Sequence, residues 1–153
     1  MASPADAEHV TRLMLLFRDW WKRDWPDDAT WARNVERLLS DDSTDFLLGS
    51  LDGEAASGVV ALRYRFSLWQ DALDCCLEDL YVEERARRYG LGEQLARAAL
   101  ERARERGCRR IELDVNEANA PALHLYEKLS FSAFSPELGG NNLMMRRYLT
   151  GVG

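Results

Sequence analysis

The residues best suited to chemistry form the turn at positions 87–92, Arg-Arg-Tyr-Gly-Leu-Gly. An apolar run at 77–82 precedes this turn and predicts a strand, and apolar side chains every four positions after it predict an amphipathic helix over 93–106. The glycines therefore stand at a helix N-terminus, where unpaired N–H groups and the helix dipole attract anions. Both glycines lack a Cβ that would hold a phosphate away, and both arginines add positive charge. This pattern predicts a site for a pyrophosphate-bearing cofactor.

Two other phosphate-binding patterns fit the turn less well. A dinucleotide fold would place a third glycine at position 95, where this chain has Leu95. A Walker loop would need a G-K-[ST] sequence, which is absent. The cofactor is therefore expected to carry a pyrophosphate without being a dinucleotide or a nucleoside triphosphate.

The turn resembles the acyl-CoA signature of the GCN5-related N-acetyltransferase (GNAT) superfamily, R-x-x-G-x-G/A, through Arg87, Gly90 and Gly92. A second segment at 119–131 is similar to that family's N-x-x-A-x-x-x-Y-x-x-x-G-F pattern. Two positions depart from the family: Arg88 follows the arginine where a glycine is usual, and Ser130 replaces the glycine before Phe131. Both departures fall in turns or helix ends and leave the expected function intact.

The resemblance implies an α/β fold, in which a mixed β-sheet is flanked by helices on both faces and residues 1–153 form a single domain of this family. Strands are expected at 46–51, 58–65, 77–82 and 111–115, with a closing pair at 131–134 and 143–148. The strand and helix lengths at 77–115 predict a crossover between parallel neighbours. The first strand of the family is expected to be short or missing, because only Met1 and Ala2 precede a helix start at Ser3 or Pro4.

The resemblance also implies acetyl-CoA as the cosubstrate. The pyrophosphate would be bound by the turn, and the backbone of the preceding strand would pair with the pantetheine arm. Asn119 matches the position that contacts this arm, although it is also a plain helix cap. Tyr126 matches the general acid that protonates the leaving sulfur. The complete expected cofactor site consists of Leu80, Tyr81, Val82, Arg87, Arg88, Tyr89, Gly90, Leu91, Gly92, Asn119 and Tyr126.

Two neighbouring carboxylates, Glu78 and Asp79, lie within the central strand. Strand alternation predicts that they project to opposite faces. The segment is similar to the strand of spermidine/spermine acetyltransferases in which an acidic pair binds and deprotonates a polyamine. We expect Glu78 to be the base, directly or through water, and Asp79 to be an acceptor-site carboxylate. The alternative is that one carboxylate pairs with Arg63 or Arg65 on the next strand.

Four of the five tryptophans lie in residues 20–31, together with three aspartates. In the family, the segment between the first two helices lies over the acceptor site. Indole faces and carboxylates attract cations, so we expect Trp21, Asp24 and Trp25 to contact the acceptor. The connection at 69–73 is also expected near the acceptor cleft. The alternative is that the tryptophans only fill core space.

The net charge of −6 argues against a nucleic-acid partner and favours cationic substrates. No apolar run is long enough to span a membrane, no signal-peptide pattern is present, and a cytoplasmic location is expected. The three cysteines form neither a disulfide framework nor a zinc motif, and no metal site is expected.

The sequence therefore predicts an N-acetyltransferase that acts on a primary amine of a small cationic acceptor, of polyamine or aminoglycoside type. Two alternatives remain open, namely a protein or peptide amine acetyltransferase and a catalytically silent acyl-CoA-binding module. A homodimer is also left open.

Overall fold

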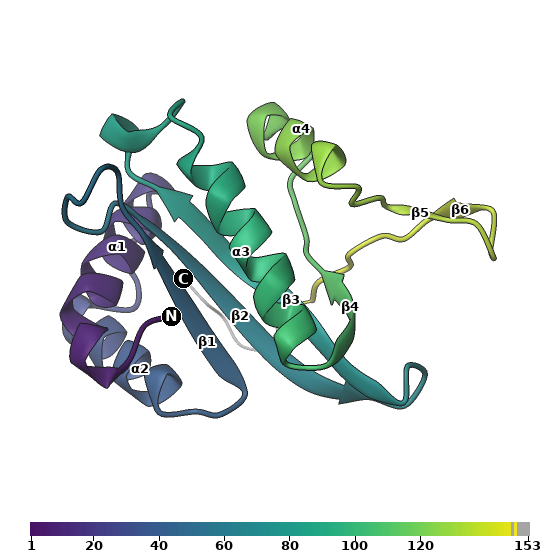
Figure 1. Cartoon of the computed structure of the whole chain (residues 1–153), viewed down its shortest axis with the longest axis horizontal. Helices are drawn as coiled ribbons and strands as arrows, with labels where there is room; N and C mark the ends of the chain where they lie inside the picture. The colour runs from purple at the N-terminus through teal and green to yellow at the C-terminus, as the bar shows by residue number, and fades with distance from the viewer. Residues whose placement is uncertain (148, 150–153) are drawn as a thin grey trace. The chain divides into compact units, whose positions relative to one another are not determined.

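The computed structural model describes residues 1–147 and 149 (Figure 1). The chain divides into two compact units, Met1–Leu113 and Asp114–Gly153, and each is described by itself. The expectation of a single domain stays a prediction. Within the described residues, no helix combines the length and apolar character needed to cross a membrane.

A four-stranded sheet in the order β1-β2-β3-β4 is the centre of the first unit. Strands β1 (Thr44–Gly49), β2 (Gly58–Ser67) and β3 (Ala72–Val82) are antiparallel neighbours. Strand β4 (Cys108–Glu112) runs parallel to β3 and is reached through α3 (Leu91–Glu105). The predicted crossover between parallel strands is therefore confirmed.

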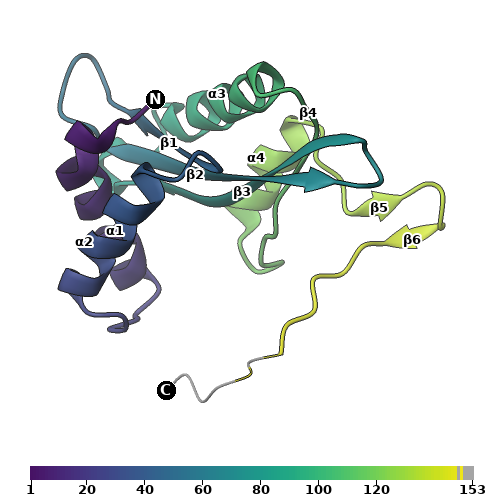
Figure 2. The ribbon, with the colours of Figure 1, turned by 90° about the horizontal axis from the view of Figure 1, so that it is seen from below.

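Helices cover both faces of this sheet (Figure 2). A short 3-10 helix, η1 (Pro4–Asp6), leads into α1 (Ala7–Trp20), and α1 packs with α2 (Asp28–Leu39) on one face. On the other face, α3 buries the apolar stripe that its sequence predicts, Leu91, Leu95, Ala96, Ala99 and Ala103. The core between the sheet and the first two helices consists of Val10, Leu13, Met14, Val35, Phe46, Val59, Ala61 and Tyr81. The predicted mixed sheet with helices on both faces is confirmed.

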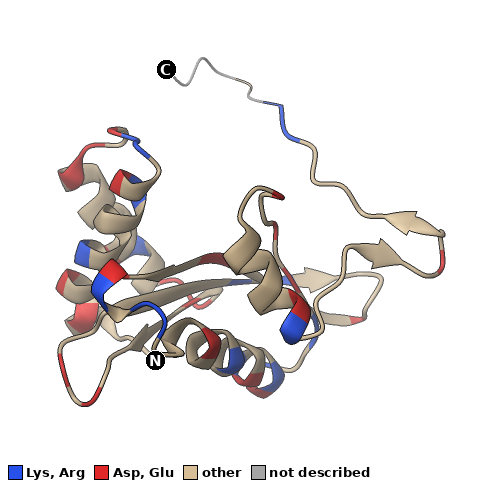
Figure 3. Ribbon diagram, turned by 90° about the horizontal axis from the view of Figure 1, so that it is seen from above, with Lys and Arg blue, Asp and Glu red and all other residues tan. Residues whose placement is uncertain are grey.

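The outer face of α3 carries acidic and basic residues in alternation (Figure 3). Glu93 pairs with Arg97 one turn later, and Glu101 pairs with Arg104. Each such pair stabilises the helix by about 0.2–0.5 kcal/mol. They also neutralise the helix surface, so this face carries no continuous basic stripe.

The described chain begins with helices, and its first strand, β1, comes after α2. No strand precedes η1 in the part of the chain described, and the Ala2 N–H donates a single hydrogen bond to the Phe46 carbonyl at 2.7 Å. The short or missing first strand is thus confirmed. Helix α2 is capped by Asp27, which accepts from the Thr30 N–H at 2.7 Å. That hydrogen bond lowers the pKa of Asp27 from its usual value.

Strand β3 begins at Ala72, five residues before the predicted start, because residues 72–77 continue the hairpin with β2. The expected connection near the acceptor cleft is therefore the tip of this hairpin, and Trp69 there is 93% exposed. Its expected place near the acceptor cleft stays a prediction. Strand β4 also lies earlier than predicted and ends at Glu112.

The second unit contains α4 (Ala120–Lys128), β5 (Phe134–Ser135) and β6 (Gly140–Asn141). The predicted closing strands were placed wrongly, since residues 143–147 form no strand and Tyr148 lies outside the described residues. Residues between the two predicted strands instead supply β6. The reason is a turn that ends at Gly139, whose φ is 69° and whose N–H donates to the Ser135 carbonyl, so pairing begins at Gly140.

Candidate active site

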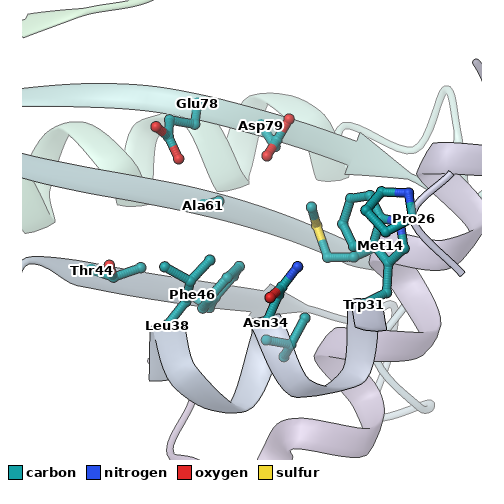
Figure 4. A pocket seen from close by; sticks show the side chains of 11 residues that line it. Met14, Pro26, Trp31, Asn34, Leu38, Thr44, Phe46, Ala61, Glu78 and Asp79 are labelled. Carbon is teal, nitrogen blue, oxygen red and sulfur yellow. The ribbon is translucent and has the colours of Figure 1, made fainter. Parts of the chain in front are cut away.

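A β-bulge in β3 decides where the two strand carboxylates point. Asp79 lies opposite Ala61 of β2 and Leu77 lies opposite Leu62, so Glu78 is an extra residue without a partner on β2. A bulge breaks strand alternation and re-aims the side chains around it. Glu78 and Asp79 consequently line the same cavity (Figure 4). The prediction that they project to opposite faces was wrong.

The cavity lies in the first unit, between the sheet and the helices α1 and α2, and has a volume of about 210 Å³. Its walls are mostly apolar, formed by Met14, Pro26, Trp31, Val35, Leu38, Phe46 and Ala61. Four polar side chains complete the lining: Asn34, Thr44, Glu78 and Asp79. Charges attract more strongly where apolar walls exclude water, so this arrangement favours a cationic guest beside the carboxylates.

Glu78 is available for such a guest. Arg63 lies 3.6 Å from Asp41, and Arg65 forms an ion pair with Glu112. Within the described part of the chain, Glu78 forms no hydrogen bond or ion pair. The alternative in which Glu78 is neutralised by a neighbouring-strand arginine is therefore not what the structure shows.

The tryptophan-rich segment contributes different residues from those predicted. Pro26 and Trp31 line the cavity, while Trp21, Asp24 and Trp25 are not part of its lining. Trp21 instead contacts Trp20 edge-on with ring centroids 5.0 Å apart. The physical reason is that α1 ends at Trp20 and α2 begins at Asp28, so these residues belong to the connection and not to a helix that packs on the sheet.

Trp31 was missed at the sequence level, although a signal for it exists. It begins the inward stripe of α2, which continues through Asn34, Val35 and Leu38 at helical spacing. Two aspartates of the segment already have structural roles, because Asp27 caps α2 and Asp28 pairs with Arg18.

The edge of β3 next to the bulge is open on one side. Pairing between β3 and β4 runs from Leu73 opposite Cys108 to Cys76 opposite Glu112. Beyond Cys76, the described residues supply no strand partner on this side of β3. Along residues 80–82, the backbone groups that face away from β2 can therefore pair with an extended, amide-containing chain, as an added strand would, except for the Val82 carbonyl, which accepts from Arg87 Nε.

The glycine turn follows β3 after a short 3-10 helix, η2 (Glu84–Ala86), and has the geometry of an anion site. Gly90 is the N-cap of α3 with φ 81°, and no side chain caps this helix. The first N–H groups of α3, including those of Leu91 and Gly92, have no intrahelical acceptor and can bind phosphate oxygens. Arg87 Nε donates to the Val82 carbonyl at 3.0 Å, which ties the turn to the end of β3.

The first departure from the family pattern also falls at a special backbone position. Arg88 has φ 69°, a left-handed conformation that favours glycine, and it is exposed together with Tyr89. The turn and the open strand edge fit the pyrophosphate and pantetheine parts of acetyl-CoA, respectively.

The two remaining predicted residues lie in the second unit. The Asn119 side chain accepts from the Ala122 N–H at 3.3 Å and so caps α4, which is one of its two expected roles. The Tyr126 ring contacts Phe131 edge-on with centroids 5.6 Å apart. Ser130, which lies between Tyr126 and Phe131, has φ 66° at the second position where the family has glycine. The roles of Asn119 and Tyr126 toward the cofactor stay predictions.

Comparisons with known proteins agree with the resemblance. Residues 10–131 match the model of the acetyltransferase (GNAT) family. Aminoglycoside N(6')-acetyltransferase type 1 from Serratia marcescens is 31% identical over 129 residues, which cover 83% of this chain and 88% of that protein. Streptothricin acetyltransferase from Streptomyces lavendulae is 38% identical over 91 residues, which cover 60% of this chain and 46%, less than half, of that protein.

A solved structure from Arthrobacter sp. FB24, described as an acetyltransferase, superimposes with a TM-score of 0.82 at 28% identity. The superposition covers 97% of this chain and 92% of that one. The predicted family and fold class are confirmed.

Proposed function

The chain belongs to the GNAT family of acetyl-CoA-dependent N-acetyltransferases, and we propose that it acetylates a primary amine of a small cationic acceptor, of aminoglycoside or polyamine type. The observation that carries this proposal is the cavity in which the bulge places Glu78 and Asp79 together among apolar walls. Two relatives are named as an aminoglycoside acetyltransferase and a streptothricin acetyltransferase, and these names support a small-molecule acceptor.

The carboxylates would have separate tasks. An amine that enters as an ammonium is attracted by both, but it can attack a carbonyl only after losing a proton. Glu78 forms no hydrogen bond or ion pair within the described residues, so it is the base in this proposal, directly or through one water. Asp79 would orient the ammonium beside it.

Acetyl-CoA, when bound, supplies the thioester that is cleaved. The backbone of Leu80 to Val82 would align its amide-rich arm, and the turn from Arg87 to Gly92 would bind the pyrophosphate. Asn119 would contact the arm. Tyr126 would donate its phenolic proton to the departing sulfur, so that the proton removed at the amine is balanced by one delivered at the thiolate.

The two alternatives are less well supported. A protein-modifying enzyme would need an open groove. Here α2 covers the cavity on the side opposite the sheet. A silent acyl-CoA-binding module would have no use for a carboxylate pair in the cavity.

The test is acetyl-CoA turnover, followed by thiol release, across polyamines, aminoglycosides, amino acids and peptides. We expect small cationic amines to be preferred. Glu78→Gln should lower kcat/KM about 10²- to 10⁴-fold, and most at low pH, where the amine loses its proton least readily. Glu101→Gln, an exposed change on α3, serves as the control and should leave kcat/KM unchanged. Turnover of neutral, anionic or peptide amines only, or no turnover at all, would contradict the proposal.

A further inference from the structure

One polar side chain interrupts the apolar stripe that α2 presents to the cavity. Trp31, Asn34, Val35 and Leu38 recur at helical spacing, and all four line the cavity. Asn34 alone among them is polar. Asparagine is a poor residue for a helix interior, so local helix stability does not explain its presence there.

The Asn34 amide is directed at the space in which an acceptor would bind. Figure 4 shows its polar end turned into the cavity, on the opposite side from Glu78 and Asp79. The amide is exposed and forms no hydrogen bond with any other residue in the described part of the chain. It therefore keeps its full capacity to donate and to accept.

Two neighbours of Asn34 in the lining also have unused hydrogen-bonding capacity. Trp31 Nε1 and Thr44 Oγ1 are buried and, among the described residues, have no hydrogen-bond partner. Both atoms are shielded from solvent, so Asn34 provides the accessible polar group on the α2 side of the cavity.

We propose that Asn34 is a specificity-determining residue that hydrogen-bonds a hydroxyl group near the reacting amine. The preferred acceptors would then be amino sugars and other amino alcohols, in preference to linear polyamines. A hydroxyl both donates and accepts, as the amide does, whereas the methylene chain of a polyamine does neither. On the α2 side of the cavity, the described lining residues include no carboxylate for a second ammonium. This inference rests on the proposed function, because it assumes that the amine is bound at Glu78 and Asp79.

The experiment compares kcat/KM for an aminoglycoside with a hydroxyl beside its reacting amine, the matched deoxy compound, and spermidine. We expect the wild type to prefer the hydroxylated acceptor over its deoxy counterpart by about 2- to 13-fold, the range of one neutral hydrogen bond. Asn34→Ala should abolish this preference by slowing only the hydroxylated acceptor. Asn34→Asp adds a charge to the wall and should raise kcat/KM for spermidine.

Arg33→Ala is the matched control, since Arg33 is an exposed neighbour on α2 that does not line the cavity. It should leave the preference between acceptors unchanged. A wild type that turns over amines but treats the two matched compounds alike would overturn this inference alone. The same holds if Asn34→Ala slows both compounds equally. A wild type that acetylates no amine in the panel would overturn the proposed function itself.

Discussion

Replacing Gly90 by alanine tests whether the turn before α3 binds the pyrophosphate. Gly90 caps α3 with φ 81°, and a Cβ built there would meet only Gln94 Nε2, at 3.9 Å. The added methyl group therefore fits the protein without a clash. At the other end of the same helix, Gly107 has φ 76°, and a Cβ there would meet nothing within 4 Å. The two glycines form a matched pair that differs in proximity to the proposed phosphate site.

The cost to stability should be the same at both positions. A left-handed alanine costs roughly 1–2 kcal/mol, and the lower entropy of the unfolded chain offsets about 0.4–1 kcal/mol of that. Each variant should thus lose about 1 kcal/mol, which lowers Tm by about 2–4 °C in a protein of this size.

The cost to CoA affinity should differ. The new Cβ in Gly90→Ala would stand between the phosphate and the backbone N–H groups, and a hydrogen bond to a charged group contributes about 1.5–3 kcal/mol. Losing one such bond weakens binding by about 10- to 100-fold. Gly107→Ala should change the CoA Kd less than about twofold. Calorimetric titration with CoA measures both variants, and equal Kd values would refute the assignment of the turn.

Three further changes test other parts of the chain. Tyr126→Phe should lower kcat by about 10- to 1,000-fold with little change in the CoA Kd, and an unchanged kcat with rate-limiting chemistry would make the tyrosine structural. Ser130→Gly should raise Tm by about 1–4 °C in thermal unfolding, because Ser130 is left-handed with φ 66°; a lower Tm would contradict this. Burial raises the pKa of Glu83, but hydrogen bonds from Arg12 and Arg85 outweigh it and leave this pKa below its usual value. The stabilisation from Glu83 is present above its unfolded pKa, about 4.3, and is lost as the pH falls through the lower folded pKa. Glu83→Gln should therefore unfold at lower urea concentration than wild type at pH 7, with a difference that shrinks below about pH 4; a constant difference would refute this.

The features that the sequence predicted correctly depend on local chemistry. The glycine turn, the helix after it and the cap at Asn119 each follow from a few adjacent residues, and their geometry is set by φ preferences and unpaired backbone groups. The apolar stripe of α3 likewise fixes which side of that helix is buried. These features sufficed to predict the family, the crossover and the cofactor.

The position and lining of the cavity depended on tertiary structure. Glu78 and Asp79 share it only because β2 and β3 pair with one residue of offset, and strand alternation within β3 alone cannot reveal a bulge. Trp31 and Asn34 line it in place of Trp21 and Trp25 because the end of α1 and the phase of α2 determine which side chains face the sheet. Such offsets and phases are set by packing between segments far apart in the chain, so the composition of residues 20–31 could not indicate which of its side chains line the cavity.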